Sequence, residues 1–212
     1  MPIDFKKTQK ELYTPGIKPG IVDVPDMIYI AVDGQGDPNT SPQYQAALEV
    51  LYSLSYAIKM SYKSGNSPKG FYEYVVPPLE GFWTVDDNAF LGDKIITDKS
   101  KFTWTSCIRQ PEFVTQDVLE WAKGLTAKRK PGLDLSQAYL WTFSEGLCAQ
   151  IMHIGSYDAE PVTIERLTAF IHESGCETDM TDRRHHEIYL GDPRKTAPEK
   201  LKTVIRHPIV RK

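Results

Sequence analysis

The strongest constraint on the fold of this chain is an order of predicted secondary structure that occurs once in each half of the sequence. In the first half, Met27–Val32 (MIYIAV) has the alternating pattern of a strand. A long helix begins after Ser41, an N-cap residue that is followed by Pro42 at the first helical position. Two more strands are predicted at Leu79–Val85 and Lys101–Ile108. This half therefore reads strand, helix, strand, strand.

The second half of the chain has the same order. A strand is predicted at Leu147–Ile154, and Pro161 opens a helix whose apolar residues recur at helical spacing. Strands are predicted again at His185–Leu190 and Lys202–Ile209. The two halves share little residue identity, so the repeat is one of structure.

Two such units predict an α+β fold. Duplicated β-α-β-β units can form an antiparallel sheet with helices on one face, which leaves a ligand cleft on the other. The chain is interpreted as a single domain over residues 1–212, with pseudo-repeats at about 26–110 and 138–210. A helical insertion at about 115–130 joins the repeats, and the polar residues 1–25 are expected to wrap the surface.

Charge and cysteine content argue against several classes of protein. The chain has 212 residues and a net charge of −3, without the basic stripe of a nucleic-acid-binding protein. Cys107, Cys148 and Cys176 are far apart, which argues against a disulfide framework or a zinc site and favours a reducing compartment. The N-terminus is too polar for a signal peptide, and no stretch approaches the roughly 20 apolar residues that cross a bilayer. We expect a cytoplasmic protein with no nucleic-acid or membrane partner.

The sequence also lacks the common catalytic motifs. It contains no glycine-rich phosphate-binding loop, no GxSxG elbow and no HExxH helix. His185 and His186 suggest a metal site, but adjacent strand residues point to opposite faces and cannot easily chelate one ion. A metal would need a further ligand such as His153. We predict no metal and no cofactor.

A carboxylate in the middle of a strand is the most informative candidate for chemistry. Strand alternation places Glu187 on one face with His185 and Tyr189, while His186 and Ile188 lie on the other face. Burial of Glu187 is expected to raise the pKa of its side chain, which suits a general acid or base. The same carboxylate could instead hold a cationic ligand.

Aromatic residues on predicted strands supply the second signal. These are Tyr72, Tyr74, Trp83, Trp104 and Tyr189, of which the first two fall on a strand predicted at Phe71–Val76. Such residues usually belong to a core. Here aliphatic residues already supply the helix-facing side, so some of the rings are expected to line the opposite face. An aromatic concavity with a carboxylate suits flat, apolar and often cationic ligands, and we predict a small-molecule ligand.

Four segments together resemble the GyrI-like small-molecule-binding family, in particular its free-standing bacterial single-domain branch. They are Val75–Trp83, Phe102–Thr115, His153–Pro161 and His185–Pro208, and they occur in the expected order over nearly the whole chain. The resemblance implies a duplicated β-α-β-β fold with a ligand cleft between the halves. Relatives include the effector-binding domains of multidrug-responsive transcription activators and gyrase-inhibitory proteins. We expect this protein to lack the DNA-binding helix-turn-helix that precedes the domain in the activators, which makes a role as a regulator a weak hypothesis.

The resemblance also implies roles for individual residues. Glu187 matches by motif the glutamate that receives cationic drugs in the drug-binding relatives. Some free-standing members are cyclopropanoid hydrolases, which open a strained ring with water. By this resemblance Glu187 and Glu160 would orient or activate water, although Glu160 could simply favour the N-terminus of its helix. The substrate would be positioned by Tyr72, Trp104 and Tyr189, and a phenol could polarise its carbonyl group.

Three hypotheses remain open from the sequence. The protein could be a non-catalytic module that senses or sequesters apolar aromatic compounds. It could be a hydrolase of cyclopropane-bearing genotoxins that uses the same cleft. It could also be an interaction protein that restrains DNA gyrase, although the sequence offers no clear surface feature for that role. A monomer or a homodimer is expected.

Overall fold

The computed structural model describes residues 1–85, 99–181 and 183–212 of the chain. Its centre is a seven-stranded sheet in the order β4-β1-β3-β2-β6-β7-β5, in which every pairing is antiparallel. The strands are β1 (Gly20–Gln35), β2 (Leu79–Val85), β3 (Phe102–Gln110), β4 (Tyr139–Ile154), β5 (Cys176–Thr178), β6 (His185–Tyr189) and β7 (Lys202–Arg211). Because β4 also pairs with β7, the sheet closes into a barrel and leaves the short β5 outside the ring.

The helices pack around this barrel. The α-helices are α1 (Phe5–Thr8), α2 (Lys10–Tyr13), α3 (Pro42–Lys59), α4 (Gln116–Arg129) and α5 (Glu160–Glu173). The short 3-10 helices are η1 (Met60–Ser64), η2 (Lys99–Lys101), η3 (Tyr157–Ala159) and η4 (Pro198–Lys200). Across the described ranges, no helix combines the length and apolar character that a membrane crossing requires.

The predicted fold class is confirmed. The order β1-α3-β2-β3 is repeated as β4-α5-β6-β7, with the short β5 added between α5 and β6, and both units contribute to one antiparallel sheet. Local signals placed the first long helix correctly, because the side chain of Ser41 accepts a hydrogen bond from the amide of Tyr44 at 3.4 Å. Gly65 has a φ of 71°, a left-handed conformation that suits glycine at the end of a helix.

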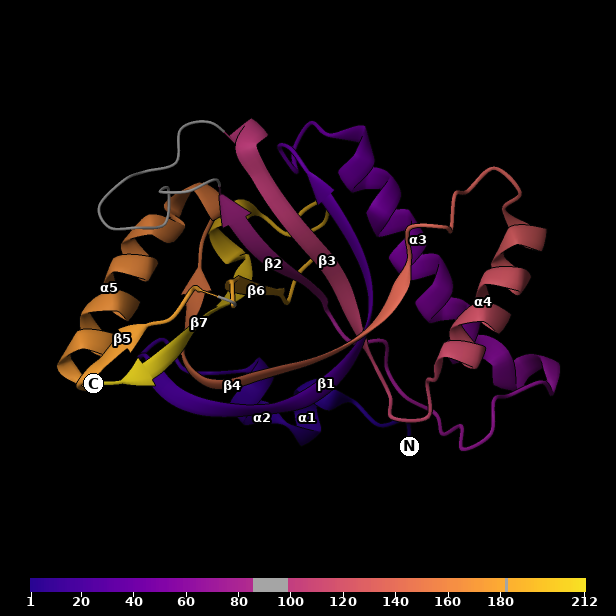
Figure 1. Cartoon of the computed structure of the whole chain (residues 1–212), viewed down its shortest axis with the longest axis horizontal. Helices are drawn as coiled ribbons and strands as arrows, with labels where there is room; N and C mark the ends of the chain where they lie inside the picture. Colours follow the sequence, from indigo (N-terminus) through magenta and orange to yellow (C-terminus); the bar gives the residue numbers. More distant parts are fainter. Residues whose placement is uncertain (86–98, 182) are drawn as a thin grey trace.

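The position of the cleft relative to the helices differs from the prediction. Helix α3 packs on β1 and β3, whereas α5 packs on β4 and β5. Figure 1 shows the two helices on opposite sides of the barrel, with β2 and β6 between them. Each helix thus covers the strands of its own half, and the central strands stay uncovered on the helix-bearing face. The pocket of the molecule is lined by side chains of α3, α5 and β6, so the cleft is on this face, between the helices.

The opposite face of the sheet is the interior of the barrel. It is filled by apolar side chains such as Tyr29, Phe82 and Ile188, all of which are buried. Helices α1 and α2 contribute Phe5 and Tyr13 to the same core. The prediction that residues 1–25 only wrap the surface is therefore wrong, because these apolar side chains are needed to fill the interior.

A buried cluster of charged residues also lies inside the barrel. The ring of His186 stacks on Phe82, with 3.9 Å between the centroids, and its two nitrogens each lie 3.0 Å from a carboxylate oxygen, of Glu80 and of Glu145. Arg206 donates to the other oxygen of Glu145 at 2.9 Å. Burial alone would raise the pKa of Glu145, but the positive charges of His186 and Arg206 lower it to about 2. Burial would lower the pKa of His186, but Glu145 raises it above its usual value. This cluster is therefore charged and internally compensated.

Candidate functional site

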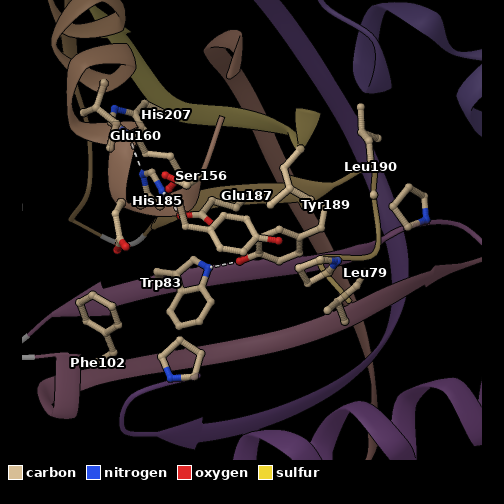
Figure 2. Close-up of a pocket in the computed structure, with 18 of the residues that line it drawn as sticks. Leu79, Trp83, Phe102, Ser156, Glu160, His185, Glu187, Tyr189, Leu190 and His207 are labelled. Carbon is tan, nitrogen blue, oxygen red and sulfur yellow. Dashed lines mark hydrogen bonds and ion pairs between the residues drawn. The ribbon is translucent and has the colours of Figure 1, made fainter. Parts of the chain in front are cut away.

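A large pocket lies between α3 and α5, and the middle of β6 forms part of its wall. Its volume is about 2720 Å³, more than the roughly 300–1,000 Å³ typical of small-molecule sites. The pocket is therefore larger than one small ligand requires, and we refer to the region around Trp83, Glu160, Glu187 and Tyr189 as its inner part. Glu160, His185, Glu187 and Tyr189 line it, together with side chains of α3. Figure 2 shows the two glutamates and His185 at one end, with Leu79 and Leu190 at the other.

Aromatic side chains form the walls of the inner part. The indole Nε1 of Trp83 donates to the hydroxyl of Tyr189 at 2.9 Å, as the dashed line in Figure 2 marks. The rings of Trp83 and Phe102 lie 5.7 Å apart, and those of Tyr157 and Tyr189 lie 5.8 Å apart. Tyr44 of α3 lies 6.0 Å from Trp83. These walls offer flat apolar surfaces with polar groups at their edges.

The contact between Trp83 and Tyr189 depends on a glycine of β2. Gly81 pairs with Glu187 across the strands, and a Cβ at Gly81 would lie 2.6 Å from Nε1 of Trp83. Only a residue without a side chain leaves room for this indole. Gly81 is thus part of the pocket although it contributes no functional group.

We expect Gly81→Ala to destabilise the protein by about 1–3 kcal/mol, because the new methyl group overpacks the indole and displaces it from Tyr189. Urea unfolding followed by tryptophan fluorescence measures this effect. Gly20→Ala is the matched control, since a Cβ at Gly20 meets no atom within 4 Å. Equal stability of the two variants would contradict the proposed role of Gly81.

Two carboxylates approach each other at the inner end of the pocket. Glu160 is the first residue of α5 and is 7% exposed. The side chain of Glu187 is 13% exposed, and one of its oxygens lies 2.8 Å from Nε2 of His185. The pair comes from different elements, since the start of α5 lies over the middle of β6.

The environments of the two carboxylates move their pKa values in opposite directions. Burial and the charge of Glu187 raise the pKa of Glu160 well above its ordinary value. Burial would also raise the pKa of Glu187, but its hydrogen bond to His185 lowers it. The expectation that burial raises the pKa of Glu187 is therefore wrong, because the partner outweighs the burial. The pKa of Glu160 therefore lies above that of Glu187, so a proton shared by the pair resides on Glu160, which is the arrangement of an acid beside a base.

The other predicted aromatic residues do not line the pocket. Trp104 is 1% exposed and lies beneath Tyr44, with 5.0 Å between the ring centroids, so it supports the wall from below. Tyr72 and Tyr74 pack with Phe113 outside the pocket, and the hydroxyl of Tyr72 donates to Glu112 at 2.6 Å.

The strand predicted at Phe71–Val76 is also wrong. Of these residues, only Tyr74 forms a β-bridge, with Ile3. The chain enters β2 only after Pro77 and Pro78, which have no amide hydrogen to donate to a ladder. This segment therefore does not bring Tyr72 or Tyr74 to the pocket face.

Sequence reasoning missed three groups that shape the site. Tyr44 belongs to the apolar stripe of its helix, and that pattern indicated only a core position. Tyr157 is the first residue of η3, a single 3-10 turn before α5, where no periodic pattern marks a ring as functional. His207 is buried and contacts His185, with 2.7 Å between their nitrogens. Its position opposite His185 depends on the pairing of β6 with β7, which a local pattern does not show.

The sequence and the fold of this chain both match known proteins. Residues 17–210 match the model of the GyrI-like small-molecule-binding domain. The crystal structure of a hydrolase from Listeria innocua has 43% sequence identity and a TM-score of 0.91, with 99% of this chain and 100% of that chain covered. An uncharacterised conserved protein from the same organism has 44% identity and a TM-score of 0.92, with coverages of 98% and 100%.

A more distant match shows the fold alone. The C-terminal domain of EcmrR has 11% identity and a TM-score of 0.55, with 92% of this chain and 98% of that chain covered. A search of curated proteins gave no match.

Proposed function

Because the chain belongs to the GyrI-like small-molecule-binding family, we propose that its pocket binds flat apolar compounds and hydrolyses those that carry an electrophilic cyclopropane ring. The observation that carries this proposal is the meeting of two buried carboxylates, Glu160 and Glu187, whose surroundings shift their pKa values in opposite directions, in a pocket with aromatic walls. The hydrolase from Listeria innocua, which is 43% identical over nearly the whole chain, supports hydrolysis as the reaction class.

The proposed reaction uses each carboxylate once. Glu187 accepts a proton from a water molecule as the water oxygen bonds to a carbon of the strained ring. The carbon–carbon bond of the ring breaks, and its electron pair moves onto the oxygen of a conjugated carbonyl group. Glu160 donates its proton to that oxygen, so the product contains one added water. Tyr189, on the same face as Glu187, helps to orient the carboxylate, and Trp83 fixes the phenol.

The pocket also suits positively charged compounds. Acidic side chains outnumber basic ones among the residues that line it. Glu187 keeps its negative charge near neutral pH, and the neighbouring indole and phenol rings offer faces for cation–π contact. We infer that lipophilic cations bind in the same inner space as the substrate.

The proposal is tested by incubating the purified protein with a cyclopropane-bearing DNA alkylator in water enriched in ¹⁸O. Mass spectrometry is expected to detect the ring-opened product with one ¹⁸O atom, formed faster than in a heat-denatured blank. Binding of the alkylator without this product would reject hydrolysis and would favour the non-catalytic sequestering module.

The rate of hydrolysis is expected to have a bell-shaped dependence on pH. As the pH falls through the lowered pKa of Glu187, this base becomes protonated and the rate decreases. As the pH rises through the raised pKa of Glu160, the acid loses its proton and the rate decreases again. Measurement of kcat/KM against pH checks both limbs, and Glu160→Gln should abolish the alkaline limb. An alkaline limb that persists in this variant would assign it to another group.

A further inference from the structure

A second histidine of the pocket lining, His207, contacts the histidine that is hydrogen-bonded to Glu187. His185 of β6 places Nε2 at 2.8 Å from an oxygen of Glu187, and its Nδ1 lies 2.7 Å from Nε2 of His207 on β7. The two rings are 2% and 4% exposed. The three side chains therefore form a continuous row from the pocket into the protein, and Figure 2 shows all three.

The buried end of this row determines where its protons lie. Burial lowers the pKa of His207 well below its usual value, so this ring is neutral and carries one N–H. The Nδ1 atom of His207 is buried and has no hydrogen-bond partner among the described residues. A buried N–H group without an acceptor is rare in proteins because it is costly. The single proton of His207 is therefore on Nε2, where it is donated to His185.

This assignment fixes the tautomer of His185. Its Nδ1 accepts from His207, so its own proton is on Nε2 and is donated to Glu187. The N–H group of His185 then favours the ionised form of Glu187 and restricts the orientation of that carboxylate.

We propose that His185 and His207 are positioning residues for Glu187: His207 fixes the tautomer of His185, and His185 holds Glu187 ionised and oriented toward the pocket. This inference rests on the proposed function, in which Glu187 accepts a proton from water. In this proposal both histidines act through Glu187, and neither takes part in the bonds that form or break. Among the residues that the structure describes, the titratable groups around the pair include Glu187 and Tyr189 on β6, Glu160 and His172 on α5, Glu145 on β4 and Glu177 on β5.

Nitrogen NMR of the whole ¹⁵N-labelled protein near neutral pH tests the tautomers without any substrate. We expect protonated Nε2 and bare Nδ1 in both His185 and His207. A spectrum in which His185 carries protons on both nitrogens, or in which the proton of His207 is on Nδ1, overturns the inference. This result is independent of turnover, so failure of the hydrolase proposal can be distinguished from failure of this one.

Variants of His207 test the consequence for Glu187. His207→Phe keeps a ring but removes the donor, so we expect the acid limb of the pH profile to move to higher pH and kcat to fall about tenfold, with KM little changed. His207→Gln can donate from its amide and should restore most of the rate and the profile. If both variants keep the wild-type profile, the inference is wrong. If His207→Phe does not fold, the comparison of His207→Gln with wild type by NMR and pH profile still decides the matter.

Discussion

Replacement of Glu187 by Gln is expected to lower the turnover of a cyclopropane-bearing compound by about 10²–10⁴-fold, because the amide cannot accept a proton from water. The side chains have nearly the same shape, so the walls of the pocket should stay in place. The measurement is the rate of formation of the ring-opened product by mass spectrometry, with wild type and variant at equal concentration.

Two controls separate this chemical role from a general loss of the pocket. Glu73→Gln changes an exposed glutamate outside the pocket and should keep the wild-type rate. Binding of ethidium, a flat fluorescent cation, should weaken in Glu187→Gln because the charge is lost, whereas a neutral aromatic probe should bind as before. Wild-type turnover in Glu187→Gln would remove this residue from the proposed mechanism.

Replacement of Glu145 by Gln is expected to have the largest effect on stability, with a loss of about 3–5 kcal/mol, because the charges of His186 and Arg206 then remain buried without their shared carboxylate. Both lie against Glu145 inside the barrel. Urea unfolding gives the free energy of unfolding for wild type and variant. The matched control is Glu120→Gln, which removes an exposed ion pair with Lys123 and should change stability by less than about 1 kcal/mol.

The same cluster predicts how stability depends on pH. The pKa of Glu145 is lowered from 4.5 to about 2, so its contribution is present above pH 4.5 and is lost as the pH falls toward 2. The pKa of His186 is raised above 6.5, so its contribution is complete below pH 6.5 and is lost as the pH rises through the raised value. Together they should be strongest between pH 4.5 and 6.5. A stability difference between wild type and Glu145→Gln that does not vary with pH would show that the cluster is uncharged.

Several features of the site could be predicted from local patterns. Strand alternation placed Glu187 and Tyr189 on one face and His186 on the other, and the structure confirms this separation of the pocket from the barrel interior. The N-cap at Ser41 and the proline at the start of α5 placed two helices. These predictions succeed because a strand repeats every two residues and a helix every 3.6, so that neighbours in sequence determine which side chains share a face.

The sequence by itself determined the family resemblance, the repeated order of elements and the face on which Glu187 lies. Only the tertiary structure decided what surrounds that face. Helices α3 and α5 pack on different strands, and the pocket lies between them. The first residue of α5, Glu160, contacts Glu187 of β6. The pairing of β6 with β7 places His207 next to His185. Tyr72 and Tyr74 were left outside. The physical reason is that the pKa values and contacts of these groups depend on residues distant in sequence, which meet only when the barrel closes.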